Sequence, residues 1–257
     1  MKDSLVIVKV GGKIVEDNNT LQQLLKDFAA IPGKKILVHG GGRSATAMAT
    51  RLGIESKMVE GRRITDADML QVVTMVYGGL VNKNIVAGLQ AKGLNAIGLT
   101  GADGNVIRSV KRPVKDIDWG FVGDVEAVNT DTLTTILNQG MIPVLAPLTH
   151  DGNGQLLNTN ADTIAGETAK ALSRIYKVTL VYCFEKPGVL LHEDDDNSVI
   201  PYISYYDFPR LVEDGTISGG MIPKLQNAFS ALQAGVTSVL ITKASNLDTL
   251  TGTTIAL

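Results

Sequence analysis

The feature that most constrains the fold is a set of short, nearly uninterrupted apolar runs that recur between stretches of helical periodicity. These runs occupy residues 5–8, 36–38, 142–145, 178–181 and 239–241. Continuous apolar runs of this length are typical of strands buried on both faces, as in parallel sheets. Strands that alternate with helices imply a mostly parallel sheet covered by helices, so the sequence predicts an α/β fold.

Helical stretches lie between these runs. Residues 20–30 place Leu21, Leu24, Leu25 and Phe28 on one helix face. Further helices are expected over residues 42–52, 66–92, 131–138, 160–172, 204–213 and 223–234. We also expect a strand over 95–99, short antiparallel strands within 106–128 and a hairpin turn at 151–154.

Composition excludes several classes of protein. The 257 residues include 24 Lys and Arg against 26 Asp and Glu, so the net charge of −2 disfavours binding dominated by nucleic-acid phosphates. The single cysteine, Cys183, cannot form an internal disulfide, which fits a reducing compartment. No apolar run approaches the ~20 residues that span a bilayer, and the first residues do not resemble a signal peptide. We therefore expect a cytoplasmic protein.

Two glycine-rich segments follow predicted strands, where parallel sheets bind ligands. The first is Lys9-Val10-Gly11-Gly12, in which a cation adjoins a glycine turn that suits phosphate. The second runs from His39 through Gly40, Gly41 and Gly42 into a helix, and its backbone N–H groups can bind an anion. Taken alone, Lys9 could simply reach solvent, and His39 could be a packed residue beside a tight turn.

Three polar segments also lie near predicted element ends. Arg62 and Arg63 precede a helix, and an arginine fork there can bind a carboxylate, although a solvated pair is the simpler reading. Asn158, Asn160 and Asp162 alternate before a helix, where Asn160 could be only an N-cap. Gly219 and Gly220 precede a predicted helix that carries Pro223 and Lys224 in its first turns, an unfavourable place for a cation unless an anion binds there.

Other chemistries lack their sequence signals. No Cys and His spacing indicates a metal site, and the three histidines indicate no catalytic triad. The dinucleotide fingerprint fails at Ala45, where it requires glycine. The phosphate loop of nucleoside triphosphatases does not occur in the chain.

Taken together and in this order, these segments resemble the amino acid kinase family over nearly the whole chain. The motifs are Lys-x-Gly-Gly, His-Gly-Gly-Gly, Gly-x-Arg-x-Thr, Gly-Phe-Val-Gly-Asp-Val at residues 120–125, Asn-x-Asn-Ala-Asp and Gly-Gly-Met-x-Pro-Lys. The resemblance implies a three-layer αβα sandwich around a mainly parallel sheet, like that of carbamate kinase. It implies ATP-dependent phosphorylation of the γ-carboxylate of an N-acylated glutamate, N-acetyl-L-glutamate, in the second step of arginine biosynthesis.

The resemblance also implies roles for individual residues. Lys9 and Lys224 resemble the lysines that stabilise the transferring phosphoryl group, and Asp162 resembles the carboxylate that holds both lysines. Backbone donors and substrate ligands are implied at Gly11, Gly12, Gly41, Gly42, Arg63, Asn158 and Asn160. The Gly-x-Arg-x-Thr spacing selects Arg63 over Arg62. Magnesium is expected to arrive with ATP, held by phosphates and water, with no protein ligand.

One segment departs from the family pattern. Family members carry a Thr/Ser-Asp-Val-x-Gly-Val run after the strand at 178–181. Here residues 182–189 read Tyr-Cys-Phe-Glu-Lys-Pro-Gly-Val, so the Asp is missing and the expected loop is longer. Only Gly188 and Val189 can be aligned. The nucleotide candidates are therefore Gly188, Thr216, Ser218 and Gly220. Cys183 is expected to be structural, because no metal or thiol partner is visible.

The family relation predicts organisation as well. Residues 1–257 form one kinase domain, in which residues 1–175 would bind the acyl amino acid and residues 176–257 would bind ATP. Members are homodimers, and those inhibited by arginine form hexamers through an added N-terminal helix. Since the first strand begins near Leu5, we expect a homodimer without arginine inhibition.

Alternatives remain at this stage. An N-succinyl group would add a carboxylate that Arg62 or Arg43 could meet. Aspartate, uridylate or aminoadipate-type substrates are sibling specificities, and Asn158, Asn160 and Arg63 weigh against the first two. A non-catalytic amino acid or nucleotide sensor would be expected to lack a catalytic lysine, whereas both are present.

Overall fold

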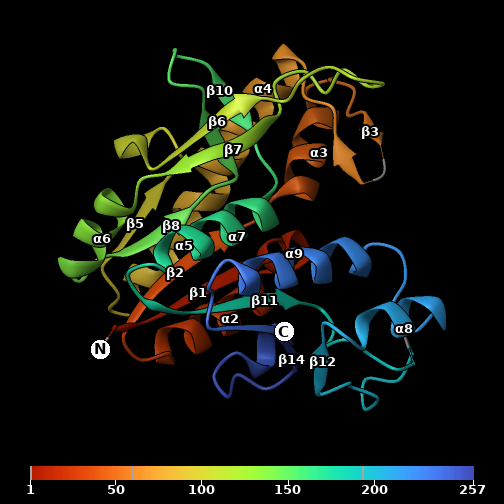
Figure 1. Cartoon of the computed structure of the whole chain (residues 1–257). Helices are drawn as coiled ribbons and strands as arrows, with labels where there is room; N and C mark the ends of the chain where they lie inside the picture. Colours follow the sequence, from red (N-terminus) through yellow and green to blue (C-terminus); the bar gives the residue numbers. More distant parts are fainter. Residues whose placement is uncertain (1, 60, 193) are drawn as a thin grey trace. The chain divides into compact units, whose positions relative to one another are not determined.

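The computed structural model describes residues 2–59, 61–192 and 194–257 (Figure 1). The chain forms two compact units. The first unit combines the first 36 residues with residues 165–257, and the second comprises residues 37–164. The chain thus leaves the first unit and returns to it. The predicted ligand-binding lobes, 1–175 and 176–257, have different boundaries and remain a prediction.

The first unit contains five strands in the order β12-β14-β13-β11-β1. β1, β11 and β13 are parallel neighbours, whereas β14 runs antiparallel to β13. The strands are β1 (Ser4–Val10), β11 (Lys177–Phe184), β12 (Tyr202–Ser204), β13 (Ser238–Lys243) and β14 (Thr253–Ala256). Side chains of β1 and β11 are buried on both faces, which confirms the interpretation of the continuous apolar runs.

Helices pack around these strands, and α9 contacts β13 and β14 (Figure 1). The helical elements of this unit are α1 (Gly12–Glu16), α2 (Asn18–Ala30), α8 (Phe208–Glu213), α9 (Met221–Gln233) and the short η3 (Ala244–Asn246), with most of α7 (Ala161–Leu172). α2 begins earlier than residue 20 because the Asp17 side chain caps it, accepting from the Thr20 N–H at 2.7 Å.

Two predicted boundaries in this unit are wrong. The strand expected to end at residue 181 continues through Phe184, because β11 pairs with β1 as far as Cys183 and with β13 as far as Phe184. The helix expected to start at residue 204 begins at Phe208. Ser204 instead ends β12 and forms a turn, in which its hydroxyl donates to Asp207 Oδ2 at 2.6 Å.

In the second unit, β2 (Lys34–His39), β8 (Ile142–Leu145) and β5 (Ala96–Leu99) are parallel neighbours in that order. A second sheet has the order β10-β9-β6-β7, formed by β6 (Ile107–Lys111), β7 (Gly123–Val128), β9 (Leu148–His150) and β10 (Leu156–Asn158). The antiparallel pairs β6–β7 and β9–β10 confirm the strands expected within 106–128 and the turn at 151–154. β3 (Met58–Val59) and β4 (Arg62–Arg63) form a small antiparallel pair.

The helices of the second unit are α3 (Gly42–Arg51), α4 (Ala67–Val73), α5 (Asn82–Gln90), α6 (Thr130–Asn138) and the single turn η2 (Asp103–Asn105). A π-helical segment, η1 (Thr74–Val81), joins α4 to α5 and contains the pair Gly78-Gly79. Asp66 caps α4 as predicted, accepting from Met69 N at 2.8 Å. The helical sequence pattern gave no sign of the π-helical segment.

The continuous helix from Ala67 to Gln90 is long and apolar enough to cross a membrane by length and composition alone. The expectation that no apolar run would be long enough to span a bilayer is therefore wrong when helix length and hydropathy alone are considered. Its apolar character has a simple explanation, because Met69, Val72, Val76 and Ile85 are buried in the unit's core. A core helix passes the same test.

Candidate functional site

In the first unit, the two predicted catalytic lysines lie against one aromatic ring. Lys9 is near the end of β1 and mostly buried, and its Nζ is 5.1 Å from the centre of the Phe184 ring. Lys224 lies in the first turns of α9, as predicted, with its Nζ 3.9 Å from the same centre. The negative face of the ring attracts both ammonium groups. The structure therefore brings Lys9 and Lys224 to one place.

The glycine turn after Lys9 is held to the same strand as this ring. Gly11 N donates to the Cys183 carbonyl at 3.2 Å, and Gly11 precedes α1, whose first residue is Gly12. A Cβ at Gly11 would lie 3.8 Å from that carbonyl and 3.9 Å from the Phe184 ring, so a small side chain would fit. Beyond the turn, Lys13 forms an exposed ion pair with Glu185 at 3.5 Å. These contacts set the geometry of an anion-binding loop.

Cys183 is buried between these elements. Burial raises the pKa of its thiol to about 12, and the nearby Lys9 only partly opposes the shift. A thiol with this pKa is protonated and unreactive at neutral pH. The expectation that Cys183 is structural agrees with its place in the core.

Four predicted nucleotide residues also belong to the first unit. Gly188 is buried, and a Cβ there would lie 2.6 Å from Thr253 Oγ1 and 2.8 Å from Val199 Cγ1, so packing alone requires glycine. Thr216, Ser218 and Gly220 lie in the loop before α9, where Ser218 and Gly220 are exposed. The structure thus groups the last three near the start of α9 and places Gly188 elsewhere, beside β14.

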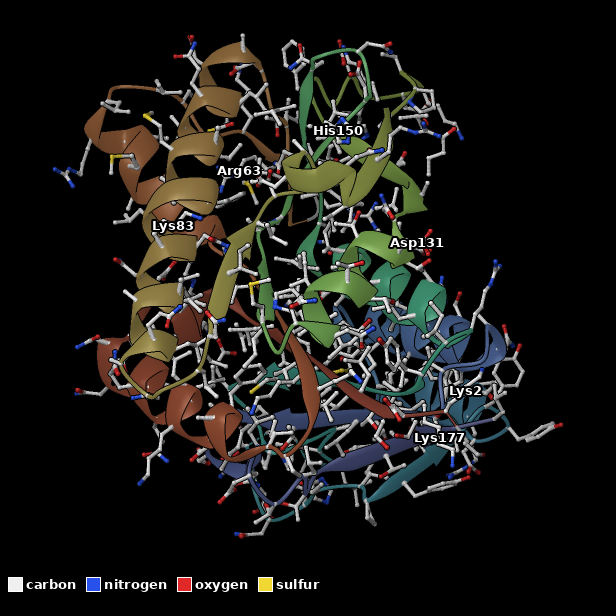
Figure 2. All side chains as sticks on the ribbon, turned by 90° about the vertical axis from the view of Figure 1, so that its left-hand side faces the viewer. Lys2, Arg63, Lys83, Asp131, His150 and Lys177 are labelled. Carbon is white, nitrogen blue, oxygen red and sulfur yellow. The ribbon has the colours of Figure 1, made fainter. Side chains whose placement is uncertain are left out.

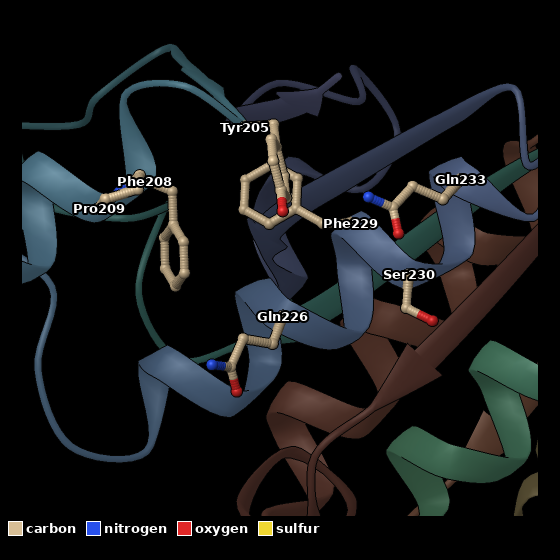
Figure 3. A pocket seen from close by; sticks show the side chains of 7 residues that line it. All are labelled: Tyr205, Phe208, Pro209, Gln226, Phe229, Ser230 and Gln233. Atoms are coloured by element: carbon tan, nitrogen blue, oxygen red, sulfur yellow. The ribbon is translucent and has the colours of Figure 1, made fainter.

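A pocket of about 400 Å³ opens on the outer side of α8 and α9 (Figure 3). Most of the side chains that line it are aromatic rings or amides. The lining residues are Tyr205, Phe208, Pro209, Gln226, Phe229, Ser230 and Gln233. Gln226, Ser230 and Gln233 lie on the face of α9 turned away from Lys224, given 3.6 residues per turn. None of the predicted site residues lines this pocket.

In the second unit, Arg63 is buried and contacts the glycine turn that begins α3. Figure 2 labels its position. Its Nη2 donates to the Gly42 carbonyl at 2.7 Å and to Thr46 Oγ1 at 2.9 Å, while its Nη1 donates to Ser56 Oγ. Arg62 is exposed. The guanidinium thus fixes the turn, and its positive charge lies directly at a helix N-terminus, where an anion is favoured.

Gly41 lies in this turn with an aromatic ring directly below it. A Cβ at Gly41 would lie 2.9 Å from Cδ1 of Tyr77, which excludes a larger residue. Tyr77 comes from the π-helical segment and is buried, and burial raises the pKa of its phenol. Gly42 is less restricted, since its Cβ would be 4.0 Å from Arg63 Nη2.

The Gly-Phe-Val-Gly-Asp-Val motif joins the strand of Arg63 to Asn158. Thr65 N donates to the Trp119 carbonyl, and Gly120 has a φ of +68° at a position where a Cβ would collide with the Thr65 carbonyl oxygen. Asn158 Nδ2 donates to the buried Thr65 hydroxyl at 2.9 Å. The motif's first glycine thus allows its backbone to approach Thr65, whose hydroxyl in turn binds Asn158.

Asn160 and Asp162 lie at the start of α7. Asn160 Oδ1 accepts from Asp162 N at 2.7 Å and from Thr163 N at 3.2 Å, which confirms its role as an N-cap. Asp162 is in the first turn of the helix and partly buried. Its carboxylate is stabilised there by the helix dipole.

Sequence reasoning missed the side chains that hold these groups in place. Phe184, Tyr77 and Thr65 contact predicted site residues, but none of them was assigned a role in the site. Phe184 was read as part of a loop, Tyr77 as part of a helix and Thr65 only as a position in the Gly-x-Arg-x-Thr motif. Within residues 2–59, 61–192 and 194–257, no group of three or more His, Cys, Asp or Glu side chains could hold a metal ion. The described residues thus offer magnesium no protein ligand set of this kind.

An α/β fold with two lysines at one glycine turn and a buried arginine at another is typical of a protein that binds anionic ligands. The chain belongs to the amino acid kinase family, whose model matches residues 4–243. It is 70% identical over 255 residues to an acetylglutamate kinase of Phocaeicola vulgatus, with 99% of each chain covered. It is 68% identical to an acetylglutamate kinase of Bacteroides fragilis, covering 99% of this chain and 98% of the relative.

A solved structure shows the same fold at lower identity. The protein smu.665 from Streptococcus mutans UA159 is 29% identical, with a TM-score of 0.79 and 98% of each chain covered. The resemblance inferred from the motifs is thereby confirmed at the level of family and fold.

Proposed function

We propose that this protein is an ATP-dependent kinase that phosphorylates the γ-carboxylate of N-acetyl-L-glutamate, forming N-acetyl-glutamyl 5-phosphate in the second step of arginine biosynthesis. The observation that carries the proposal is the 70% identity to an acetylglutamate kinase over 99% of both chains. The lysine cluster around Phe184 and the buried Arg63 give the proposal a physical basis.

The chemistry places few demands on acid–base catalysis. A γ-carboxylate oxygen attacks the γ-phosphorus of ATP, a new O–P bond forms, and the bond to the ADP oxygen breaks. The nucleophile is already ionised, so no base is needed, and the barrier is lowered by positioning and charge stabilisation. We assign that stabilisation to Lys9 and Lys224, with Asp162 as the acidic member of the catalytic set.

The backbone at Gly11 and Gly12 supplies N–H donors for the transferring phosphoryl group. Thr216, Ser218 and Gly220, in the loop before Lys224, are proposed to contact the nucleotide, together with Gly188. Mg²⁺ neutralises phosphate charge when it is bound, and we propose that phosphate oxygens and water molecules supply its ligands.

The acyl amino acid is assigned to the second unit. Arg63 is the cation for its carboxylate, and Gly41 and Gly42 offer the helix N-terminus beside it. Asn158 donates through Nδ2 to Thr65, which leaves its Oδ1 to accept from the substrate's amide N–H. Asn160 completes the set proposed to bind the acyl amino acid.

We further propose a cytoplasmic homodimer. The long helix of the second unit exposes Met75 and Leu80, each about half exposed, next to Gly79. A second copy packed on this face would bury these apolar side chains. Light scattering on the eluted protein, with Leu80→Glu as the disrupting variant, tests the assignment. A wild-type monomer, or a Leu80→Glu dimer of unchanged affinity, would contradict it.

A second substrate deserves direct comparison. Arg43 and Arg62 are exposed cations adjacent to Gly42 and Arg63, and either could meet the additional carboxylate of an N-succinyl group. The deciding assay follows ADP release with ATP and Mg²⁺ for N-acetyl-glutamate, N-succinyl-glutamate, free glutamate and aspartate. Preference for N-acetyl-glutamate supports the proposal, and preference for N-succinyl-glutamate replaces the substrate. Absence of turnover with all four would favour a sibling kinase or a sensor.

A further inference from the structure

A buried hydrogen-bonded pair, His39 and Asn82, has no role in the function proposed so far. His39 is fully buried at the end of β2, and Asn82 is fully buried at the start of α5. Asn82 Nδ2 lies 3.1 Å from His39 Nε2, and His39 Nδ1 lies 2.7 Å from the carbonyl oxygen of Gly40. The pair therefore reaches the glycine turn that carries Gly41.

The surroundings of Asn82 determine which atom donates to which. Asn82 Nδ2 also donates to the Val144 carbonyl at 2.9 Å, and its Oδ1 accepts from Lys83 Nζ at 3.3 Å. A Cβ at Gly98 would collide with that Oδ1, so glycine at this position admits the amide. Because the Val144 carbonyl only accepts and the Lys83 ammonium only donates, the amide has one orientation.

This orientation sets the tautomer of His39. Asn82 donates its second N–H to His39 Nε2, which must then be unprotonated. The ring proton is on Nδ1 and is donated to the Gly40 carbonyl. Burial lowers the pKa of His39 to about 4, with Lys83 lowering it further and the Gly40 carbonyl opposing the shift, so the ring stays neutral near pH 7.

The held carbonyl has a consequence for the next residue. The Gly40–Gly41 peptide is trans, so its C=O and N–H point in opposite directions. With the carbonyl directed at His39, the Gly41 N–H points away from the buried ring. The Tyr77 ring lies close to Gly41 on the side where a Cβ would point.

We propose that His39, oriented by Asn82, is a positioning residue that fixes the direction of the Gly41 N–H, so that this group donates to the anionic reactant. The identity of the anionic reactant rests on the proposed function. The orientation of the His39 ring and of the Gly40–Gly41 peptide is independent of the proposed function.

Two substitutions separate positioning from packing. His39→Asn keeps an N–H near the position of Nδ1 and can still donate to the Gly40 carbonyl. His39→Gln places its amide near Nε2, where it can contact Asn82 but cannot hold the carbonyl. Both remove the ring, so both should lower the melting temperature by similar amounts.

The kinetic readout is kcat and KM for both substrates beside the melting temperature. Complete loss of a preorganised hydrogen-bond donor lowers kcat by about 10²–10³. A backbone N–H that is present but points in the wrong direction should lower kcat by somewhat less. We expect His39→Gln to lose about tenfold to a hundredfold in kcat, and His39→Asn to remain within about threefold of wild type. Equal losses in the two variants, or losses that follow the melting temperature alone, would overturn the inference.

A second readout does not depend on turnover. Nitrogen-15 NMR of the imidazole rings reports the tautomer of His39, with the partly exposed His150 and the exposed His192 as internal references. The expected state at pH 7 is neutral with the proton on Nδ1, and a proton on Nε2 or a charged ring would refute the proposal. If wild type fails to phosphorylate N-acetyl-glutamate while the tautomer is as expected, the proposed substrate fails and the positioning of the turn stands.

Discussion

The two units hold their charged groups in different ways. In the first unit, Lys9 and Lys224 lie against the Phe184 ring, a contact without fixed direction. In the second unit, Arg63 is held by directed hydrogen bonds to Gly42, Thr46 and Ser56. Arg63 thus presents a charge that is fixed to the backbone and side chains of its own unit, whereas the two lysines share one aromatic contact. Substitutions in the two units therefore test different kinds of contact.

The largest expected effect comes from removing either lysine. Lys9→Ala and Lys224→Ala should each lower kcat by about 10²–10⁴, because each removes charge stabilisation at the transferring phosphoryl group. ADP release measures the loss, and circular dichroism checks that the fold persists. Lys13→Ala is the matched control, since Lys13 lies in α1 just beyond the same glycine turn and forms an exposed ion pair with Glu185. A near-wild-type rate in either lysine variant would remove that residue from the mechanism.

The two lysines were identified from the sequence because they lie near glycine pairs in motifs that resemble the amino acid kinase family. Their common contact with Phe184 was not predicted. The segment Tyr-Cys-Phe-Glu-Lys-Pro-Gly at 182–188 reads as a loop, since Pro187 and Gly188 dominate local propensity. Pairing with β1 and β13 overrides that preference and extends β11 to Phe184. The Phe184 ring then lies at the carboxyl end of a strand inside the sheet, which no local pattern indicated.

The second unit shows the same limit over longer separations. The motif spacing selected Arg63 over Arg62, and Arg63 is the buried one. Its partners at residues 42, 46 and 56 precede it by 21, 17 and 7 residues, and no sequence pattern indicated them. Asn82 is 43 residues from His39, and Asn158 is 93 residues from Thr65, so these contacts depend on how whole elements pack.

The second-largest effect is on the free energy of unfolding, and it should come from protonation of His39 in the second unit. The unfolded chain binds a proton at His39 below about pH 6.5, whereas the folded protein does so only below about pH 4. The unfolded state therefore holds more protons between these values, and the free energy of unfolding should fall by about 3 kcal/mol in total as pH drops from 6.5 to 4. Above pH 7 this contribution is constant.

Urea unfolding at a series of pH values measures this effect, with His39→Gln as the reference that cannot take up the proton. Wild type should lose more stability than the variant on acidification. Parallel curves for the two proteins between pH 6.5 and 4 would show that His39 titrates normally in the folded state.

A smaller effect is expected when the rigid fork is replaced by a point charge. Arg63→Lys retains the positive charge but cannot bond Gly42, Thr46 and Ser56 together. We expect KM for the acylated glutamate to rise about tenfold to a hundredfold while KM for ATP changes little. Arg62→Lys is the control on the adjacent exposed arginine and should remain close to wild type with N-acetyl-glutamate. A larger change in KM for ATP than for the acyl substrate would reverse the assignment of the two units.

The smallest effect concerns the ring beneath the lysines. Phe184→Leu keeps an apolar side chain at the end of β11 but removes the π-face that attracts Lys9 and Lys224. Cation–π contacts contribute about 0.5–2 kcal/mol, which corresponds to about a twofold to thirtyfold loss in kcat. Phe184→Tyr keeps the face and should lose little. Lys9→Ala and Lys224→Ala should each still lower kcat strongly when combined with Phe184→Leu, because the ring only supports the two ammonium groups. If Phe184→Leu and Phe184→Tyr are equally slow, the π-face does not support the lysines, and the shared aromatic contact has no functional part in the first unit.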